Sequence, residues 1–216
     1  GGNPPKPGEI TKAHHGVLFL DELPEFSHQV LNQLRQPMES GTIEIHRAHH
    51  HLRYPAQFQL IAAMNPCPCG WLGSARPCSC LGDAISRYQR KVSGPIMDRI
   101  DLQVSVPAVQ PEHLLEEFKA PPVTHRTGQT EHEQLRATLE RAKRFRDHRE
   151  TFDNRPMPQQ LHSEALAFMT DAATRLHLSG RSIRKVISIG RTIADLGVTR
   201  LITPQHLIEA LSLRPN

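Results

Sequence analysis

Two short apolar runs, each ending in polar residues, stand out in the first half of the chain. Val17 to Leu20 is followed at once by Asp21 and Glu22, and the stretch FQLIAAMNP ends its apolar run at Asn65. Runs this short and this rich in β-capable residues favour strands buried on both faces, as in parallel α/β sheets. The pattern predicts two core strands whose carboxyl ends carry Asp21, Glu22 and Asn65.

Other periodic patterns surround these runs. Residues 24–39 repeat apolar side chains at about every fourth position, which predicts an amphipathic helix. Residues 42–57 alternate apolar and polar positions around a polar middle, which predicts a β-hairpin. A cysteine-bearing loop, a basic helix around residues 85–92 and a strand over residues 101–107 are expected to follow.

The second half of the chain shows only helical patterns. From Pro107 to about Thr130 the composition changes to Pro, Thr, Gly and charged residues, which is typical of a linker. Helices are expected over residues 131–150, 162–176, 179–196 and 203–213, the last with Thr203-Pro204 as its N-terminal signal. The sequence thus predicts an α/β domain over residues 1–107, a linker over 108–130 and an all-α domain over 131–216.

Composition narrows the class of protein. The 216 residues carry a formal net charge of +4, a mild basic bias that is compatible with nucleic-acid contact without requiring it. No apolar run approaches the roughly 18 residues of a membrane span, and the N-terminus lacks a signal-peptide pattern. We expect a cytoplasmic protein without a membrane partner. The opening residues resemble a loop entered partway, so we expect the chain to be the C-terminal part of a longer protein.

The acidic strand end suggests phosphate chemistry. Ligands of α/β sheets bind beyond the carboxyl ends of the strands, where one carboxylate can hold Mg²⁺ and a second can orient an attacking water. An apolar run followed by Asp21 and Glu22 is the Walker B pattern of ATPases. The alternative is a buried strand that ends in a polar turn before a helix. Asn65 favours the ATPase interpretation, because a second strand tip then carries suitable chemistry.

Five stretches together resemble the ComM/YifB family of magnesium-chelatase-like AAA+ ATPases: PPKPGEITKAHHGVLFLDELPEF, LRQPMESGTIEIHRA, LIAAMNPCPCG, SGPIMDRIDL and RTIADL. The resemblance covers nearly the whole chain. It implies part of an AAA+ α/β core, with a parallel sheet and a β-hairpin insertion, followed by an all-α lid domain. It also implies a self-assembled ring, typically a hexamer, which uses ATP and Mg²⁺. The implied activity is helicase-like branch migration of DNA, branched or single-stranded, during natural transformation.

The resemblance also implies roles for individual residues. Asp21 would be the Mg²⁺-associated acid and Glu22 the catalytic base that positions water. Asn65 would be sensor 1, Arg99 in MDRID the arginine finger reaching a neighbouring subunit, and Arg181 in LSGRSIRK sensor 2. No Gly-x-x-x-x-Gly-Lys-Ser/Thr loop occurs in the chain. We therefore expect the phosphate-binding loop upstream of Gly1, and this piece alone to be inactive.

Simpler interpretations of the arginines stay open. From its neighbours alone, Arg99 is a helix-end arginine paired with Asp98 or Asp101. The alternative for Arg181 is a solvent-facing helix charge, and other arginines lie close by in the sequence, at positions 184 and 191. Arginines also crowd residues 136–149, where interleaved acids favour a solvated helix surface.

The four cysteines fall in one loop, as Cys67, Cys69, Cys78 and Cys80. Four thiolates can form a closed tetrahedral site for structural Zn²⁺. The C-x-C spacing is tighter than the usual C-x₂-C, so free thiols remain an alternative, and disulfides a less favoured one in a cytoplasmic setting.

The expected hairpin carries basic residues. His49, His50 and His51 are expected at its turn, as a polar tip rather than a metal site. Because the hairpin before sensor 1 often points into the pore of AAA+ motors, the resemblance implies that Arg47 and Arg53 contact DNA phosphates. Two rival functions stay open, the ATPase subunit of a porphyrin magnesium chelatase and a non-enzymatic interaction fragment.

Overall fold

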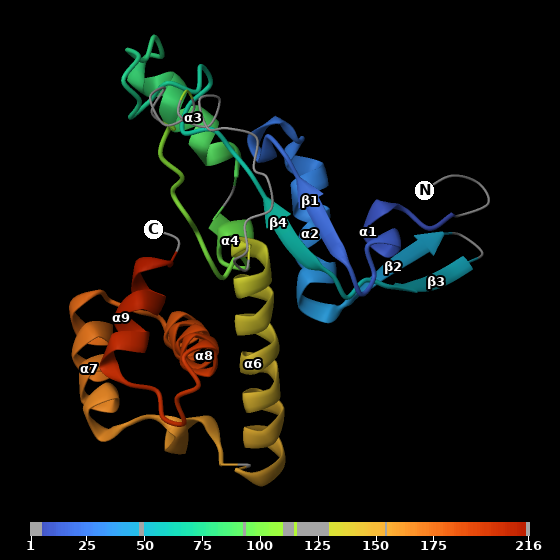
Figure 1. Ribbon diagram of the computed structural model, residues 1–216. Coiled ribbons are helices and arrows are strands. Elements are labelled where there is room, and N and C mark those ends of the chain that lie inside the picture. Colours follow the sequence, from blue (N-terminus) through green and yellow to red (C-terminus); the bar gives the residue numbers. More distant parts are fainter. Residues whose placement is uncertain are drawn as a thin grey trace. The chain divides into compact units, whose positions relative to one another are not determined.

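The computed structural model describes residues 6–47, 50–92, 94–109, 115, 130–153 and 155–214. The chain divides into two compact units, Gly1–Ile100 and Asp101–Arg214. All named strands lie in the first unit, whereas the second is helical (Figure 1). Within the described residues, no helix combines the length and the apolar character that crossing a membrane requires.

A short parallel sheet forms the centre of the first unit. β1 (Val17–Leu20) pairs with β4 (Gln59–Ala62), with Leu20 opposite Ala62. Burial on both faces was predicted for these strands, and this is wrong for the described part of the chain, where Val17 and Phe19 are 53% and 59% exposed. The described helices cover one face of these two strands, and the other face meets solvent.

The core of the first unit lies between this sheet and α2 (His28–Ser40). Leu31 and Leu34 of α2 are buried with Leu23, and the alternate β1 residues Leu18 and Leu20 pack against them. The predicted helix over residues 24–39 starts late, because residues 23–25 form the 3₁₀ turn η1 (Leu23–Glu25). The α2 helix then starts after Ser27, whose hydroxyl accepts a hydrogen bond from the Val30 N–H at 3.3 Å.

An antiparallel hairpin connects α2 to β4. It consists of β2 (Thr42–Arg47) and β3 (His50–Pro55), with Ile43 opposite Tyr54. The residues between the strands, including His49, lie outside the described residues. His50 and His51 belong to β3 and not to the turn, which corrects the predicted position of both.

The first unit is completed by α1 (Glu9–Lys12), α3 (Gly82–Lys91) and α4 (Gly94–Met97). The strand predicted over residues 101–107 is absent, since residues 101–109 have no regular structure and Val104 and Val106 are 67% and 83% exposed. An alternating pattern forms a strand only where a partner strand accepts it, and no described strand pairs with this segment. Of the predicted linker 108–130, only residues 108, 109, 115 and 130 are described.

The second unit packs helices around an apolar core. Its elements are α6 (Glu131–Phe152), η2 (Met157–Gln160), α7 (Ser163–Arg175), α8 (Gly180–Leu196) and α9 (Pro204–Ser212). Met169, Val186, Ile202 and Leu207 are buried together. α8 and α9 approach closely at Gly190, where an added Cβ would lie 3.0 Å from the Leu207 side chain.

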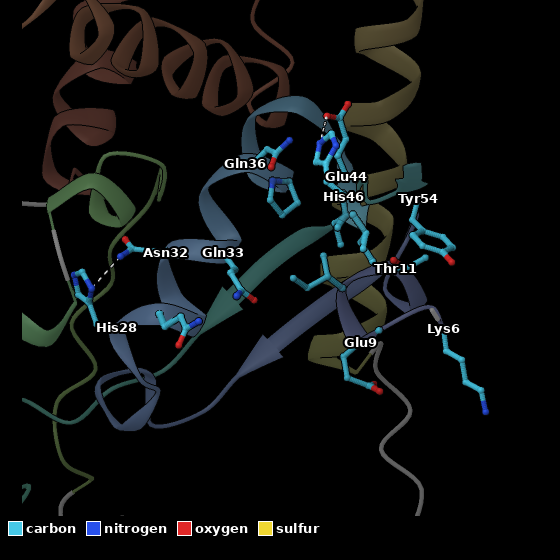
Figure 2. A pocket seen from close by; sticks show the side chains of 16 residues that line it. Lys6, Glu9, Thr11, His28, Asn32, Gln33, Gln36, Glu44, His46 and Tyr54 are labelled. Atoms are coloured by element: carbon cyan, nitrogen blue, oxygen red, sulfur yellow. Dashed lines mark hydrogen bonds and ion pairs between the residues drawn. The ribbon is translucent and has the colours of Figure 1, made fainter. Parts of the chain in front are cut away.

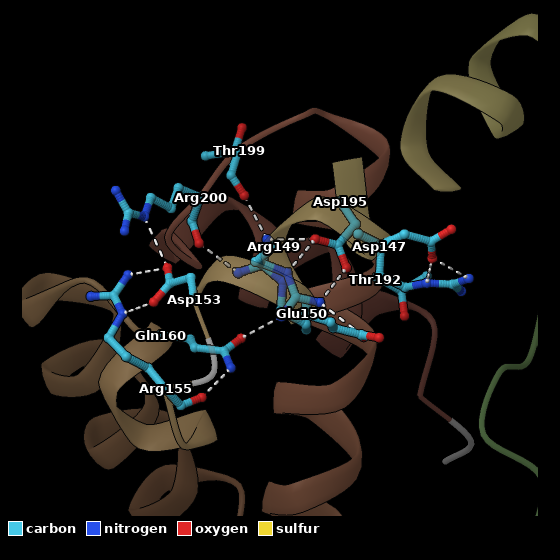
Figure 3. A network of polar contacts seen from close by, with 12 residues as sticks. Asp147, Arg149, Glu150, Asp153, Arg155, Gln160, Thr192, Asp195, Thr199 and Arg200 are labelled. Carbon is cyan, nitrogen blue, oxygen red and sulfur yellow. Dashed lines mark hydrogen bonds and ion pairs between the residues drawn. The ribbon is translucent and has the colours of Figure 1, made fainter. Parts of the chain in front are cut away.

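Polar side chains are also buried in this unit. Arg149 of α6 is 8% exposed and donates two hydrogen bonds of 3.1 Å to the Asp195 carboxylate (Figure 3). Arg191, 4% exposed, contacts the same carboxylate at 3.0 Å and donates to the Thr199 and Arg200 carbonyls. The predicted solvated surface for residues 136–149 is therefore wrong at Arg149, which is a structural residue.

Removing the shared carboxylate should destabilise the second unit strongly. Asp195→Ala would leave Arg149 and Arg191 buried without their acid, and breaking a buried pair in this way costs about 3–5 kcal/mol. Asp147→Ala is the matched control, because Asp147 also lies inside a helix and its contact with Arg146 is exposed. Urea unfolding should show a large loss for the first variant and a change below about 1 kcal/mol for the second. Equal losses would contradict this role of Asp195.

Candidate functional site

The carboxyl ends of β1 and β4 bring the two predicted polar groups to one edge of the sheet. The Ala63 N–H donates to the Leu20 carbonyl at 2.9 Å, and the Leu23 N–H donates to the Ala63 carbonyl at 2.9 Å. These bonds continue the pairing past the strands and fix Asp21 and Glu22 beside the segment that leads to Asn65. Asp21, Glu22 and Asn65 are all exposed, so this edge is open to a ligand.

Glu22 has an unusual backbone conformation for a glutamate. Its φ of 50° and ψ of 47° are left-handed, and its N–H donates to Asp21 Oδ1 at 2.8 Å. Non-glycine residues pay on the order of 1 kcal/mol for this conformation, and such residues concentrate at functional sites. The conformation lets the chain turn directly from β1 into η1 while both carboxylates stay accessible.

No ion pair of Asp21 or Glu22 is formed within the described part of the chain. Two exposed, uncompensated carboxylates are hard oxygen donors, which Mg²⁺ prefers. Asp21 uses one oxygen to accept the Glu22 N–H and retains the other for a ligand. The donor set thus fits a magnesium ion at Asp21, with Glu22 beside it.

Tyr88 is a neighbour of this edge that sequence reasoning missed. It lies on α3, is 6% exposed, and its pKa is raised by burial and by the negative charge of Glu25, with a smaller contribution from Glu22. The Asn65 backbone acts in the opposite direction and lowers this pKa to a smaller extent. Its spacing from Ile85 and Val92 matches one face of a helix and could have marked it as a core residue, but no sequence signal placed it next to the acids.

Arg99 lies away from its own chain's acidic edge. It follows α4, its side chain is 11% exposed, and its guanidinium contacts the Glu39 carboxylate at 2.5 Å and the Pro95 carbonyl. Asp98 and Asp101 were the predicted partners from sequence proximity, whereas Asp101 pairs with Lys185 at 3.0 Å. Glu39 stands in the last turn of α2 and Glu22 before its first turn, and a 13-residue helix is about 20 Å long.

Arg181 belongs to the second unit. It is exposed in the first turn of α8, which Ser179 caps by accepting a hydrogen bond from the Ser182 N–H at 3.1 Å. Arg184 is also exposed, whereas Arg191 is held in the buried network around Asp195. The structure thus removes Arg191 from the candidates for a ligand-contacting arginine in this helix.

The four cysteines converge. Sulfur atoms of Cys67, Cys69 and Cys78 are 3.4–3.6 Å apart, and all four Sγ atoms, including that of Cys80, lie within 4.8 Å of one another. All four are free thiols. The Trp71 backbone N–H, and to a smaller extent that of Ser79, lowers the pKa of Cys69 to about 5. By contrast, desolvation and contacts with the neighbouring thiols raise the pKa of Cys78 to about 12, so a thiolate is favoured at Cys69 and not at Cys78.

The hairpin presents a polar surface. Exposed Arg53 lies opposite Glu44 in the β2–β3 register, while the side chain of Arg47 lies outside the described residues. His46 and His51 stack with ring centroids 4.3 Å apart, and each has a nitrogen within 4 Å of Glu44. The side chains of His46 and His51 are 71% and 60% exposed, and that of Glu44 is 34% exposed.

A pocket of about 1000 Å³ lies between α1, α2 and this hairpin (Figure 2). Its lining includes Lys6, Gln33, Glu44, His46 and Tyr54, and none of the acidic-edge residues. The pocket is therefore separate from the carboxylates that carry the candidate chemistry.

Comparisons with known proteins identify the family of the chain. A sequence model of the family "Magnesium chelatase, subunit ChlI" matches residues 1–114, and that of its C-terminal region matches residues 128–214. The chain is 38% identical to the uncharacterised protein YifB of Escherichia coli K12 over 218 residues, covering 99% of this chain and 42% of that protein. It is 40% identical over 222 residues to the competence protein ComM of Haemophilus influenzae, with the same coverage.

A shorter match links the chain to a chelatase subunit. The magnesium-chelatase 38 kDa subunit of Acidiphilium rubrum is 34% identical over 61 residues, which cover 28% of this chain and 18% of that protein. The chain thus spans about two fifths of the length of YifB and ComM. One family model covers more than half of the chain, and relatives that match 99% of it carry the ComM and YifB names, so the chain belongs to the magnesium chelatase subunit ChlI family, as a ComM/YifB-like member.

Proposed function

We propose that this chain is part of an AAA+ ATPase motor that acts on DNA, a ComM-like branch-migration helicase. One observation carries the proposal: Asp21 and Glu22 stand at the carboxyl end of β1, next to the end of β4 that leads to Asn65. This is the edge at which α/β sheets bind ligands. The similarity to competence protein ComM supports DNA as the substrate.

In this proposal Asp21 and Glu22 have different roles. Asp21 holds Mg²⁺, which when bound supplies charge neutralisation to the phosphates of ATP. Glu22 accepts a hydrogen bond from the attacking water, and its left-handed backbone presents the carboxylate beyond the strand. Asn65, as sensor 1, provides an amide from the neighbouring strand end. Arg181, as sensor 2, provides a lid arginine for the γ-phosphate.

The position of Arg99 supports a ring. Because Arg99 is at the far end of α2 from Glu22, it is poorly placed to serve its own chain's acidic edge. An arginine finger acts on the nucleotide of the next subunit, which suits this placement. We infer a ring of identical subunits, which the family resemblance implies is a hexamer. In this ring, Arg47 and Arg53 of the hairpin contact DNA phosphates.

The proposal applies to the full-length protein. The chain contains no Gly-x-x-x-x-Gly-Lys-Ser/Thr sequence, so the loop that cradles the phosphates must come from outside it. We propose that residues 1–107 complete the ATPase core, that 108–130 link it to the lid, and that 131–216 form that lid. The piece by itself is then inactive in ATP hydrolysis.

A second candidate function is the ATPase subunit of a porphyrin magnesium chelatase. The name of the matching family and the Acidiphilium rubrum subunit favour it. Like the first candidate it uses ATP and Mg²⁺, but it drives the insertion of Mg²⁺ into a porphyrin. DNA should therefore not affect its ATPase activity.

Nucleic-acid stimulation of the ATPase separates these candidates. We expect a four-way junction to raise the ATP turnover of the full-length protein well above its basal rate, and magnesium-dependent migration of the junction to accompany it. Duplex DNA without a branch is the substrate control. A turnover that is indifferent to all DNA would contradict the motor on DNA and favour the chelatase. Absence of both ATP binding and hydrolysis would favour an interaction fragment.

A further inference from the structure

The loop between β4 and α3 has almost no apolar core of its own. Of residues 66–81 only Cys67 is buried, and Trp71, Leu72 and Leu81 are 40%, 38% and 79% exposed. Ordered segments of this length without regular structure are uncommon in compact domains unless something else holds them. Small units that lack a core are usually held by disulfides or by a metal.

The arrangement of the sulfur atoms distinguishes these two possibilities. A disulfide requires an S–S distance of about 2.05 Å, whereas the sulfur atoms of Cys67, Cys69 and Cys78 lie 3.4–3.6 Å apart. Four sulfurs bound to one zinc ion at about 2.3 Å stand roughly 3.8 Å apart at the corners of a tetrahedron. The cluster, with all four Sγ atoms within 4.8 Å, is close to the second geometry.

We propose that Cys67, Cys69, Cys78 and Cys80 bind one structural Zn²⁺. Four protein thiolates fill a tetrahedral zinc site, so no position is left for a substrate or a water, and the ion has a structural role. Cys67 is fully buried and the other three are partly exposed, so the site is embedded on one side and reachable by metal on the other. Bound zinc then stabilises the fold of this loop in place of a hydrophobic core.

The bound ion would also fix the surroundings of the strand end. The loop starts at Pro66, whose carbonyl accepts a hydrogen bond from Gln89 of α3 at 3.0 Å. Gly70, with a φ of 80°, lies beside Asn65, because a Cβ there would be in ordinary van der Waals contact with the Asn65 side chain at 3.9 Å. Zinc binding would thus order the segment that surrounds Asn65. This consequence does not depend on whether the protein is an ATPase.

Metal analysis and cobalt replacement test the identity of the ion. Protein purified without added metal should contain about one zinc per chain. After removal by a strong chelator, Co²⁺ should bind with the absorption bands of a tetrahedral tetrathiolate complex, and Zn²⁺ should then displace it. Protein that carries no zinc, carries iron instead, or has four thiols that react freely in the native state would overturn the assignment.

Trp71 provides a second, local readout. It is the single tryptophan of the chain and lies between the two cysteine pairs, with Arg76 4.6 Å above its ring. Adding Zn²⁺ to chelator-treated protein should change its fluorescence, with saturation at one equivalent. Cys78→Ser should lose the stoichiometric zinc and this response, while the matched control Ser79→Ala should retain both. If Cys78→Ser retains one tightly bound zinc, or if Ser79→Ala loses it equally, the four-cysteine site is wrong.

Because Cys78→Ser could also unfold the loop, the unaltered protein supplies the deciding comparison. Chelation should lower its melting temperature, and Zn²⁺ alone, not Mg²⁺, should restore it. A melting temperature that changes with neither the chelator nor zinc would contradict a structural ion. None of these readouts uses ATP turnover, so they stand or fall separately from the proposed motor.

Discussion

Glu22→Gln in the full-length protein is expected to bind ATP normally and to lose turnover by about 10²–10⁴-fold. Glutamine keeps the size of the side chain and a hydrogen-bonding oxygen, but it cannot take a proton from the attacking water. The variant should adopt the left-handed backbone at position 22 as the parent protein does, because the glutamine and glutamate side chains differ by one polar atom. Steady-state hydrolysis and equilibrium binding of a fluorescent ATP analogue measure the two effects separately.

Glu25→Gln is the matched control for this variant. Glu25 is also exposed, lies three residues further along and contacts Lys91 at 3.4 Å. A surface pair of this kind contributes at most about 1 kcal/mol to stability, so its loss should leave turnover nearly unchanged. If the Glu22 variant retained near-normal turnover, Glu22 would have no role in the chemistry. Equal losses in both variants would indicate a general effect of charge in this segment.

Periodicity predicted the longer helices of both units, but not the four-residue helices α1 and α4, because the signals are local. The apolar spacing and the capping signals of α6 to α9 depend on neighbouring residues, and Thr130 and Thr203 cap their helices as such residues usually do. The prediction of a strand over residues 101–107 was wrong because strand formation depends on a distant partner and not on local signals. Alternation says that a strand would have two different faces, but not whether another strand is available to pair with it.

The polar partners were beyond sequence reasoning. Arg149 looked like its exposed neighbours, and only α8, which supplies Asp195 46 positions later, makes it a buried residue. Arg99 forms its ion pair with Glu39, 60 positions earlier, although acidic residues stand next to Arg99 in the sequence. Charge patterns predict which groups can pair within a helix, whereas pairing across elements follows from packing. The assignments of Asp21, Glu22 and Asn65 depended less on packing, because parallel strand ends share one edge.

The largest expected effect is that of Arg99→Ala, which should leave ATP binding largely intact while lowering turnover by about 10³–10⁵-fold. The reason is that an arginine finger stabilises charge that develops on the transferred phosphoryl group, in a site that belongs to the next subunit. Glu39→Gln is the matched control, because it removes the ion pair that Arg99 makes in its own chain and keeps the arginine. Turnover of the Glu39 variant should stay close to that of the parent protein.

Mixing inactive proteins tests the ring directly. Arg99→Ala protein keeps Glu22, and Glu22→Gln protein keeps Arg99, so a mixed ring contains some interfaces at which both residues are intact. Mixing under conditions of subunit exchange should therefore restore part of the ATPase activity, although neither protein is active alone. If Arg99 serves only to hold Glu39 and the end of α2, Glu39→Gln should reproduce the defect and mixing should restore nothing. Verified mixed rings without recovered turnover would remove Arg99 from the active site.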